Sequence, residues 1–279
     1  MKLGQKLAVN YLRARLNLLA VISPQRAAKK AFNIFCTPFY RSKKEFPPVF
    51  KQAEKHTISL HGITLQGFKW NRGGSKRVLI LHGFESSCRN FDAYIKALIQ
   101  KGYEVIAFDA PAHGSSGGKQ ITLPLYIEAI TAVHFKFGGI QSFIAHSFGG
   151  LAVTHFLEKI PTADTSLALI APATETNTAI NSFFKFLQLG QNVRTEFEKI
   201  IEEKSGHPAG YFSIPRALQN IQSNVLWVHD EDDDITPIKD VEPLMQEPNP
   251  HLSFMITRGL GHKKIYRDNK VIRAVVDFL

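Results

Sequence analysis

Short apolar runs alternate with amphipathic stretches along most of the chain. The apolar runs predict strands over residues 56–60, 64–70, 77–81, 104–108, 142–145, 166–170, 225–228 and 252–256. Helices are predicted over residues 91–101, 123–137, 149–159 and 270–279, with a short helix after Pro237. Residues 77–81 (RVLIL) are apolar at four of five positions, which is typical of a strand buried on both faces. We therefore predict an α/β fold, a mostly parallel sheet flanked by helices.

Two segments depart from this alternation. Residues 1–50 have a helical pattern and end in a stretch broken by prolines, and residues 173–220 form a polar and aromatic insertion after the sixth strand. We predict a helical N-terminal extension, residues 1–50, and a main domain, residues 51–279. The apolar side chains of the insertion could form a small core of their own or line an apolar pocket. They are Phe183, Phe184, Phe186, Leu187, Leu189, Tyr211 and Phe212.

The charge of the chain is concentrated in the N-terminal extension. The whole chain has a formal net charge of +10, and residues 1–50 alone hold ten Lys and Arg against one acid, Glu45. A nucleic-acid-binding protein would more often spread its basic patch over the folded domain, so we expect no nucleic-acid partner. Two cysteines, Cys36 and Cys88, exclude a disulfide-dense scaffold and favour a cytoplasmic location.

The first helix has a basic face and an apolar remainder. The apolar run at residues 16–22 is too short to span a bilayer. It resembles the apolar region of a signal peptide, but no convincing cleavage site follows it. One interpretation is a helix packed on the main domain with its basic face in water, the commoner arrangement. The other is a peripheral contact with an anionic membrane through residues 1–30. The face consists of Lys2, Lys6, Asn10, Arg13 and Asn17.

Candidate chemistry lies at the carboxyl ends of the strands, where α/β sheets place their sites. Ser147 follows a strand and precedes a helix, and Ala145 and Gly149 provide the small flanks of a sharp turn that exposes a nucleophile. The alternative is that Ser147 only caps the helix. After another strand, Gly83 could let the N–H of Phe84 point to the same centre as the N–H of Phe148, forming an oxyanion hole.

An acid and a histidine follow two later strands. Residues 230–234 are all acidic, and one of these carboxylates can orient a histidine. A metal site there is not expected, because the EF-hand spacing and its glycine are absent. His262 follows a glycine-rich strand exit and is the natural general base, although an exposed loop histidine is the alternative. Along the chain the order is Ser147, then an acid near 233, then His262. This is the Ser…Asp…His order of one known hydrolase arrangement.

Five motifs together resemble the α/β-hydrolase superfamily, in the branch of small-capped esterases, monoacylglycerol-lipase-like enzymes and serine-aminopeptidase-like proteins. The motifs are residues 81–84, 108–116, 145–149, 233–237 and 259–262, and the resemblance covers roughly residues 55–279. It implies that Ser147 is the nucleophile, His262 the base and Asp233 the acid, selected by Pro237. It also implies that Phe84 and Phe148 supply oxyanion N–H groups, and that the insertion at about 174–220 is a helical cap.

Two departures from the family pattern bear on the site. Ala145 replaces the first glycine of the elbow, and Asp230 stands where a glycine is usual. The second departure leaves Asp230, Asp232 and Asp234 as alternatives for the catalytic acid. A serine at the elbow argues against the epoxide and haloalkane hydrolases, which resemble this fold but use a carboxylate nucleophile.

The expected function is hydrolysis of a carboxylic ester, thioester or amide through an acyl-enzyme, with no metal or organic cofactor. The expected partner is a small, apolar acyl substrate. One alternative is a lysophospholipase or thioesterase drawn to acidic or membrane-borne substrates by the basic N-terminus. Another is a non-catalytic binding protein on a hydrolase fold.

Overall fold

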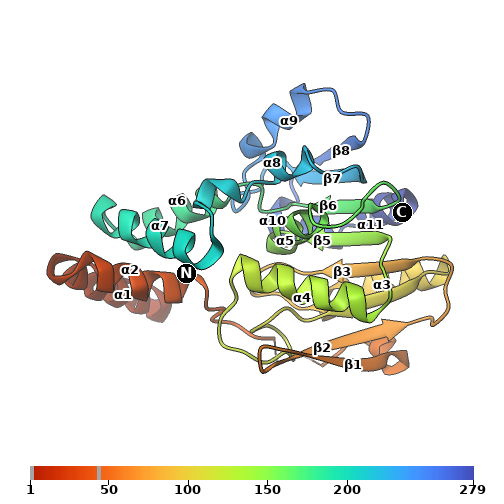
Figure 1. Cartoon of the computed structure of the whole chain (residues 1–279), viewed down its shortest axis with the longest axis horizontal. Helices are drawn as coiled ribbons and strands as arrows, with labels where there is room; N and C mark the ends of the chain where they lie inside the picture. The colour runs from red at the N-terminus through yellow and green to blue at the C-terminus, as the bar shows by residue number, and fades with distance from the viewer. Residues whose placement is uncertain (1–2, 43–44) are drawn as a thin grey trace. The chain divides into compact units, whose positions relative to one another are not determined.

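The chain folds into two compact units in a computed structural model that describes residues 3–42 and 45–279. The helical unit combines Met1–Thr37 with Glu175–Ser213, and the sheet unit combines Pro38–Thr174 with Ile214–Leu279. Figure 1 shows the chain coloured by residue number, from red at the N-terminus to blue at the C-terminus. Residues 3–37 therefore pack with the insertion, and this segment ends at Thr37, whereas the predicted extension runs to residue 50.

The sheet unit is built on one eight-stranded sheet with the order β1-β2-β4-β3-β5-β6-β7-β8. The first two strands pair antiparallel with each other and β2 pairs antiparallel with β4, and all other pairs are parallel. The strands are β1 (Glu54–Leu60), β2 (Ile63–Trp70), β3 (Arg77–Leu81), β4 (Glu104–Phe108), β5 (Ser142–His146), β6 (Ser166–Ile170), β7 (Asn224–Asp230) and β8 (Leu252–Thr257).

Helices cover both faces of this sheet, as Figure 1 shows for α4 on one side. Alternate side chains of β3 point to opposite faces: Leu79 and Leu81 join the core under α4 and α5, and Val78 and Ile80 join the core under α3 and α11. Burying each such side chain contributes roughly 1.5–3 kcal/mol. The helices are α3 (Asp92–Gln100), α4 (Leu123–Lys136), α5 (Phe148–Leu157), α8 (Ile214–Leu218), α9 (Glu242–Gln246), α10 (Gly261–Lys264) and α11 (Asn269–Phe278), and the short 3-10 turns are η1 (Pro48–Gln52), η2 (Cys88–Phe91), η4 (Ile238–Asp240) and η5 (Ile265–Arg267).

The predicted mostly parallel sheet with flanking helices is confirmed, and so is each predicted strand, with ends that differ by a few residues. Because β3, β5, β6, β7 and β8 run parallel, their carboxyl ends share one edge of the sheet. The segments that follow β3, β5, β7 and β8 hold the candidate catalytic residues. The topology therefore gathers on one edge groups that are far apart in sequence.

The helical unit contains α1 (Leu3–Ile22), α2 (Pro24–Phe35), α6 (Thr176–Leu187), α7 (Gln191–Ser205) and the turn η3 (Ala209–Tyr211). The predicted helical N-terminus is thus two helices. They separate at Ser23, whose hydroxyl accepts the N–H of Arg26 at 3.3 Å, and Pro24 occupies the first position of α2. A serine followed by proline is a strong helix-start signal, and here it divides the predicted helical N-terminus into two helices.

Aromatic residues of the insertion form the core of the helical unit with α2. The ring of Phe197 lies 5.7 Å from that of Phe32 and 5.1 Å from that of Phe184, and Phe35 packs edge-on against Phe183. Of the apolar residues of the insertion, Phe184 is buried in this core and Phe183 and Leu189 pack against it, whereas Phe186 is 46% exposed. The interpretation as a small core therefore holds for Phe183, Phe184 and Leu189. None of the helices described by the structure is both long and apolar enough to cross a membrane.

Candidate active site

Ser147 occupies a sharp turn between β5 and α5. Its backbone angles, φ 54° and ψ −123°, are unusual for a residue with a side chain and cost about 1–3 kcal/mol. The surrounding contacts enforce the turn: a Cβ on Gly149 would lie 2.8 Å from the carbonyl oxygen of His82. Ser147 is thus held in a strained conformation at the start of a helix, where a nucleophilic serine is usually placed.

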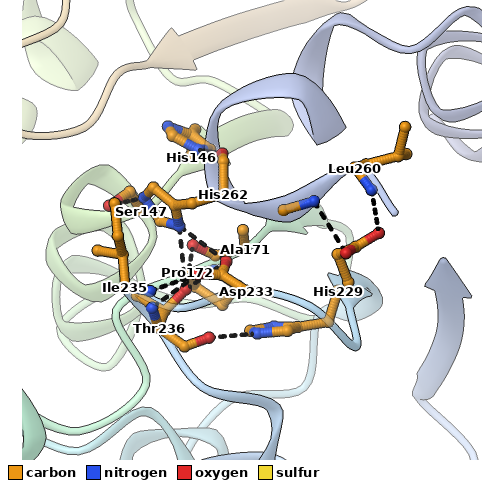
Figure 2. Close-up of polar contacts among 12 residues, drawn as sticks. His146, Ser147, Ala171, Pro172, His229, Asp233, Ile235, Thr236, Leu260 and His262 are labelled. Atoms are coloured by element: carbon orange, nitrogen blue, oxygen red, sulfur yellow. Dashed lines mark hydrogen bonds and ion pairs between the residues drawn. The ribbon is translucent and has the colours of Figure 1, made fainter. Parts of the chain in front are cut away.

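His262 lies between Ser147 and Asp233. Its Nε2 is 3.0 Å from the Ser147 hydroxyl, and its Nδ1 is 2.8 Å from Oδ2 of Asp233. Figure 2 shows these three side chains, and all three are at least nine-tenths buried. With the proton of the neutral ring on Nδ1, His262 donates to Asp233, and Nε2 is free to accept the serine proton. The geometry is that of a nucleophile, a base and an orienting carboxylate.

The carboxylate of Asp233 is fixed by its own turn as well as by His262. Its Oδ1 accepts the N–H groups of Ile235 and Thr236 at 2.9 and 2.8 Å. Burial opposes the charge of this carboxylate, but the hydrogen bond and charge of His262 and the backbone donors outweigh burial and lower the pKa of Asp233. An ionised Asp233 can stabilise a positive charge on His262.

Thr236 and His229 support the acid turn and were not singled out from the sequence. The hydroxyl of Thr236 donates to Oδ2 of Asp233 at 2.8 Å and lies 3.1 Å from Nδ1 of His262. The fully buried His229 donates from Nε2 to the carbonyl of Thr236 at 2.7 Å, and Trp227 donates to its Nδ1 at 3.2 Å. Burial lowers the pKa of His229, so this ring is neutral. The only sequence signal for Thr236 was its place before Pro237.

Two of the three alternative acids hold the loop that carries His262, residues 258–262. Asp230 accepts the N–H of Gly261 on Oδ1 at 2.8 Å, and on Oδ2 it accepts the N–H of Leu260 at 3.1 Å and the hydroxyl of Thr257 at 2.6 Å. Asp232 accepts the N–H of Gly259 at 2.9 Å. The hydrogen bonds that Asp230 accepts outweigh the effect of its burial and lower the pKa of Asp230.

Only Asp233 among these acids contacts the His262 ring in the described chain, and Asp234 is exposed. The structure therefore places the acid selected by Pro237 on His262. Asp230, which stands where the family usually has a glycine, instead accepts hydrogen bonds from the backbone of residues 260–261.

The candidate oxyanion donors, the N–H groups of Phe84 and Phe148, follow the neighbouring strands β3 and β5. Neither N–H donates to any acceptor among the described residues. Gly83 brings the first of them close to Ser147, because a Cβ on Gly83 would lie only 2.7 Å from the Ser147 Cβ. The two rings contact each other edge to face, with centroids 6.4 Å apart. The site thus holds two unpaired donors beside a candidate nucleophile.

Two neutral histidines brace the loops around these donors. His82 accepts the N–H of Ala110 at 3.0 Å and so braces the loop that follows β4. His113 accepts the N–H of Glu85 at 3.0 Å and donates from Nδ1 to the carbonyl of Pro111 at 2.9 Å. Burial is the largest cause that lowers the pKa of His113 to about 3.

Another buried histidine, His146, packs against the ring of His262. His146 donates from Nε2 to the carbonyl of His262 at 3.1 Å, and its ring lies between those of His262 and Tyr266, at centroid distances of 4.8 and 4.5 Å. Burial and then the charge of His262 lower the pKa of His146 to about 3. A neutral His146 is a hydrogen-bond donor to the His262 backbone and no competing positive charge.

The described residues contain no group of three His, Cys, Asp or Glu side chains arranged to hold a metal ion. Cys88 is buried beside the loop that follows β3, and burial raises the pKa of its thiol well above the ordinary value. Such a thiol is a poor nucleophile.

Comparisons with known proteins show that the chain is similar to hydrolases. Residues 74–206 match the family model of serine aminopeptidase, S33, a segment that includes Phe84 and Ser147 but ends before Asp233 and His262. The uncharacterized protein YqkD of Bacillus subtilis is 22% identical over 244 residues, or 79% of this chain and 77% of its own. A serine hydrolase-like protein of Dictyostelium discoideum is 28% identical over 196 residues, or 60% of this chain and 53% of its own.

A solved structure shows the same fold. The esterase Pf2001 of Pyrococcus furiosus superposes with a TM-score of 0.66 at 20% identity, covering 88% of this chain and 96% of that one. At this identity the likeness concerns the fold, and the predicted α/β-hydrolase fold is thereby confirmed.

Proposed function

We propose that this protein of the α/β-hydrolase fold is a serine hydrolase that cleaves a carboxylic ester, or a thioester or amide, through an acyl-enzyme. The observation that carries the proposal is the continuous hydrogen-bonded series from Ser147 through His262 to Asp233, at 3.0 and 2.8 Å. A serine is a weak nucleophile unless a base is within hydrogen-bond reach, and this spacing meets that requirement.

In the first half of the reaction, Ser147 Oγ attacks the carbonyl carbon while His262 Nε2 takes the serine proton. Asp233 holds the ring and stabilises the imidazolium. The N–H groups of Phe84 and Phe148 receive the negative oxygen of the tetrahedral intermediate, each worth about 3–4 kcal/mol in well-studied cases. The carbon–oxygen, carbon–sulfur or carbon–nitrogen bond then breaks, and His262 returns its proton to the leaving group.

In the second half, His262 removes a proton from water, which attacks the acyl carbon of the Ser147 ester. The same donors receive the oxyanion, and the collapse of this second intermediate releases the carboxylic acid. His262 gives its proton back to Ser147. This cycle needs no group beyond the residues named.

The test is labelling of the full chain with a fluorophosphonate probe, together with hydrolysis of p-nitrophenyl esters of increasing acyl length. We expect the wild type to be labelled, Ser147→Ala to be inert, and His262→Ala and Asp233→Asn to be slowed by about 10³-fold or more. Asp234→Asn is the matched control, because this neighbouring carboxylate is exposed, and it should react at the wild-type rate.

One outcome would replace the proposal, and another would narrow its substrate class. A folded wild type that neither reacts with the probe nor hydrolyses any ester would favour a binding protein on a hydrolase fold. Hydrolysis confined to lysophospholipids or acyl thioesters would favour a lysophospholipase or thioesterase, the alternative that the basic N-terminus suggests.

A further inference from the structure

Helix α1 presents a row of exposed apolar side chains on one face. At 100° per residue these positions fall within a sector of about 100°. The row, called here the apolar stripe, consists of Leu7 (62% exposed), Tyr11 (67%), Leu18 (66%), Val21 (84%) and Ile22 (70%). Single exposed apolar residues are ordinary, but five on one face of one helix are not.

The packing of α1 within the helical unit does not use this stripe. The opposite face carries the buried Leu16 and Ala20, and α1 contacts α2 and α6. Arg13 is also on the packed side, where it donates to the carbonyl of Phe186 at 2.7 Å and its guanidinium lies 5.3 Å from that ring.

Part of the basic face predicted from the sequence is therefore engaged in packing, since Arg13 and Asn17 are half-buried. Lys2, another residue of that face, lies outside the described residues. The fold of the helical unit leaves the apolar stripe facing solvent instead.

The segment of the chain that carries the stripe is basic. Residues 1–37 contain seven Lys and Arg and no Asp or Glu. Five of these bases are exposed, two on α1 and three on the adjoining α2: Lys6, Arg15, Arg26, Lys29 and Lys30. An apolar row accompanied by bases, without a neighbouring acid in the same segment, has the chemistry of a surface that binds anionic lipid.

We infer that the apolar stripe of α1 docks on an anionic lipid surface, with α1 lying along that surface and the exposed bases of α1 and α2 at the headgroups. Because α1 is packed along one side, only its opposite side is available to lipid. The lipid contact is therefore made by the exposed face of α1 and not by an end of the helix. A second copy of the chain fits less well, because pairing two such segments would bring like charges together.

The experiment measures sedimentation of the full chain with vesicles of phosphatidylcholine and phosphatidylglycerol in equal amounts, and with vesicles of phosphatidylcholine alone. The variant L18Q/V21Q/I22Q changes only exposed positions, and circular dichroism checks its fold. Phe135→Gln is the matched control, an equally exposed apolar residue (69%) on α4 of the sheet unit. The variant K29Q/K30Q tests the charges.

We expect the wild type to bind the anionic vesicles and the stripe variant to bind at least tenfold more weakly, with Phe135→Gln unchanged. The variant K29Q/K30Q should bind several-fold more weakly, and added salt should weaken wild-type binding. Failure to bind anionic vesicles would overturn the inference, and so would undiminished binding by the stripe variant. Dimers in sedimentation velocity that the stripe variant abolishes, without lipid binding, would assign the stripe to a second copy.

Discussion

The Asp230 carboxylate accepts the backbone N–H of Gly261, the residue directly before His262, at 2.8 Å. Together with its bond to the N–H of Leu260, this contact ties the acid segment after β7 to the loop after β8. Asp230 does not touch the His262 ring, so its influence on His262 acts through the backbone.

Replacement of Asp230 by alanine should therefore lower both activity and stability. The N–H groups of Gly261 and Leu260 would lose a charged acceptor, and we expect a loss of about 2–4 kcal/mol in the free energy of unfolding. Displacement of His262 should reduce the rate of fluorophosphonate labelling at least tenfold. Asp232→Ala removes only the contact to Gly259 at the exposed end of the loop and should cost less on both measures. Labelling of Asp230→Ala at the wild-type rate would contradict this role.

Thr236→Val should slow catalysis without removing any member of the Ser147–His262–Asp233 series. The substitution keeps the shape of the side chain but deletes the hydroxyl that donates to Asp233 and lies 3.1 Å from His262. One lost hydrogen bond of about 1–1.5 kcal/mol corresponds to a roughly tenfold lower kcat/KM. Thr236→Ser retains the hydroxyl and should restore most of the rate in ester hydrolysis. Equal rates for the valine and serine variants would show that the hydroxyl is not used.

Gly83→Ala should impair the site by crowding Ser147. The added Cβ would lie 2.7 Å from the Ser147 Cβ, a distance that forces one of the two backbones to move. We expect kcat/KM to fall about 100-fold and the free energy of unfolding to fall by about 1–3 kcal/mol. Gly4→Ala on α1 is the control, since a Cβ there meets nothing within 4 Å. It should keep full activity, and any substantial loss in that variant would point to a general sensitivity of the fold.

Stability should fall as the pH is lowered from 6.5 towards 3, in part because of His113. The pKa of this buried ring is lowered to about 3 in the folded state, whereas an unfolded histidine titrates near pH 6.5. Between these values the unfolded chain binds the extra proton, so the free energy of unfolding decreases with falling pH. Each such histidine contributes about 1.4 kcal/mol per pH unit well below pH 6.5.

Urea unfolding at pH 7 and pH 5 measures this effect. His113→Gln removes one titrating group, so the difference in unfolding free energy between the two pH values should shrink by roughly 1–2 kcal/mol relative to the wild type. The comparison uses a difference within each protein, so a general destabilisation of the variant does not affect it. An unchanged difference would mean that His113 is protonated in the folded protein.

Local sequence patterns were sufficient for the sheet and for the candidate nucleophile and base. The central strands β3, β4 and β6 are marked by apolar runs, because a strand buried on both faces is rich in apolar residues. Ser147 and His262 were found because small residues flank them at strand ends, and the backbone turns there require such residues. These signals are contained in a few neighbouring residues and need no knowledge of distant contacts.

The choice among the acids of residues 230–234 could not be made from the residues alone. All five are acids in one short turn, and their side chains diverge: Asp233 points to His262, Asp230 to the backbone of the next loop, and Asp234 to solvent. Resemblance to a family selected Asp233 through Pro237. The role of Asp230 was invisible in the sequence because its partners lie some thirty residues away, across the pairing of β7 with β8.

The sequence by itself determined the alternation of strands and helices, the order of serine, acid and histidine, and the basic character of the N-terminus, because these properties depend on residue type and local spacing. Only the tertiary structure decided that Met1–Thr37 packs with Glu175–Ser213, and hence which face of α1 is buried. When apolar residues lie on more than one side of a helix, the sequence pattern does not determine which side packs against another segment of the chain. That outcome depends on contacts between segments more than 130 residues apart, such as Phe32 with Phe197.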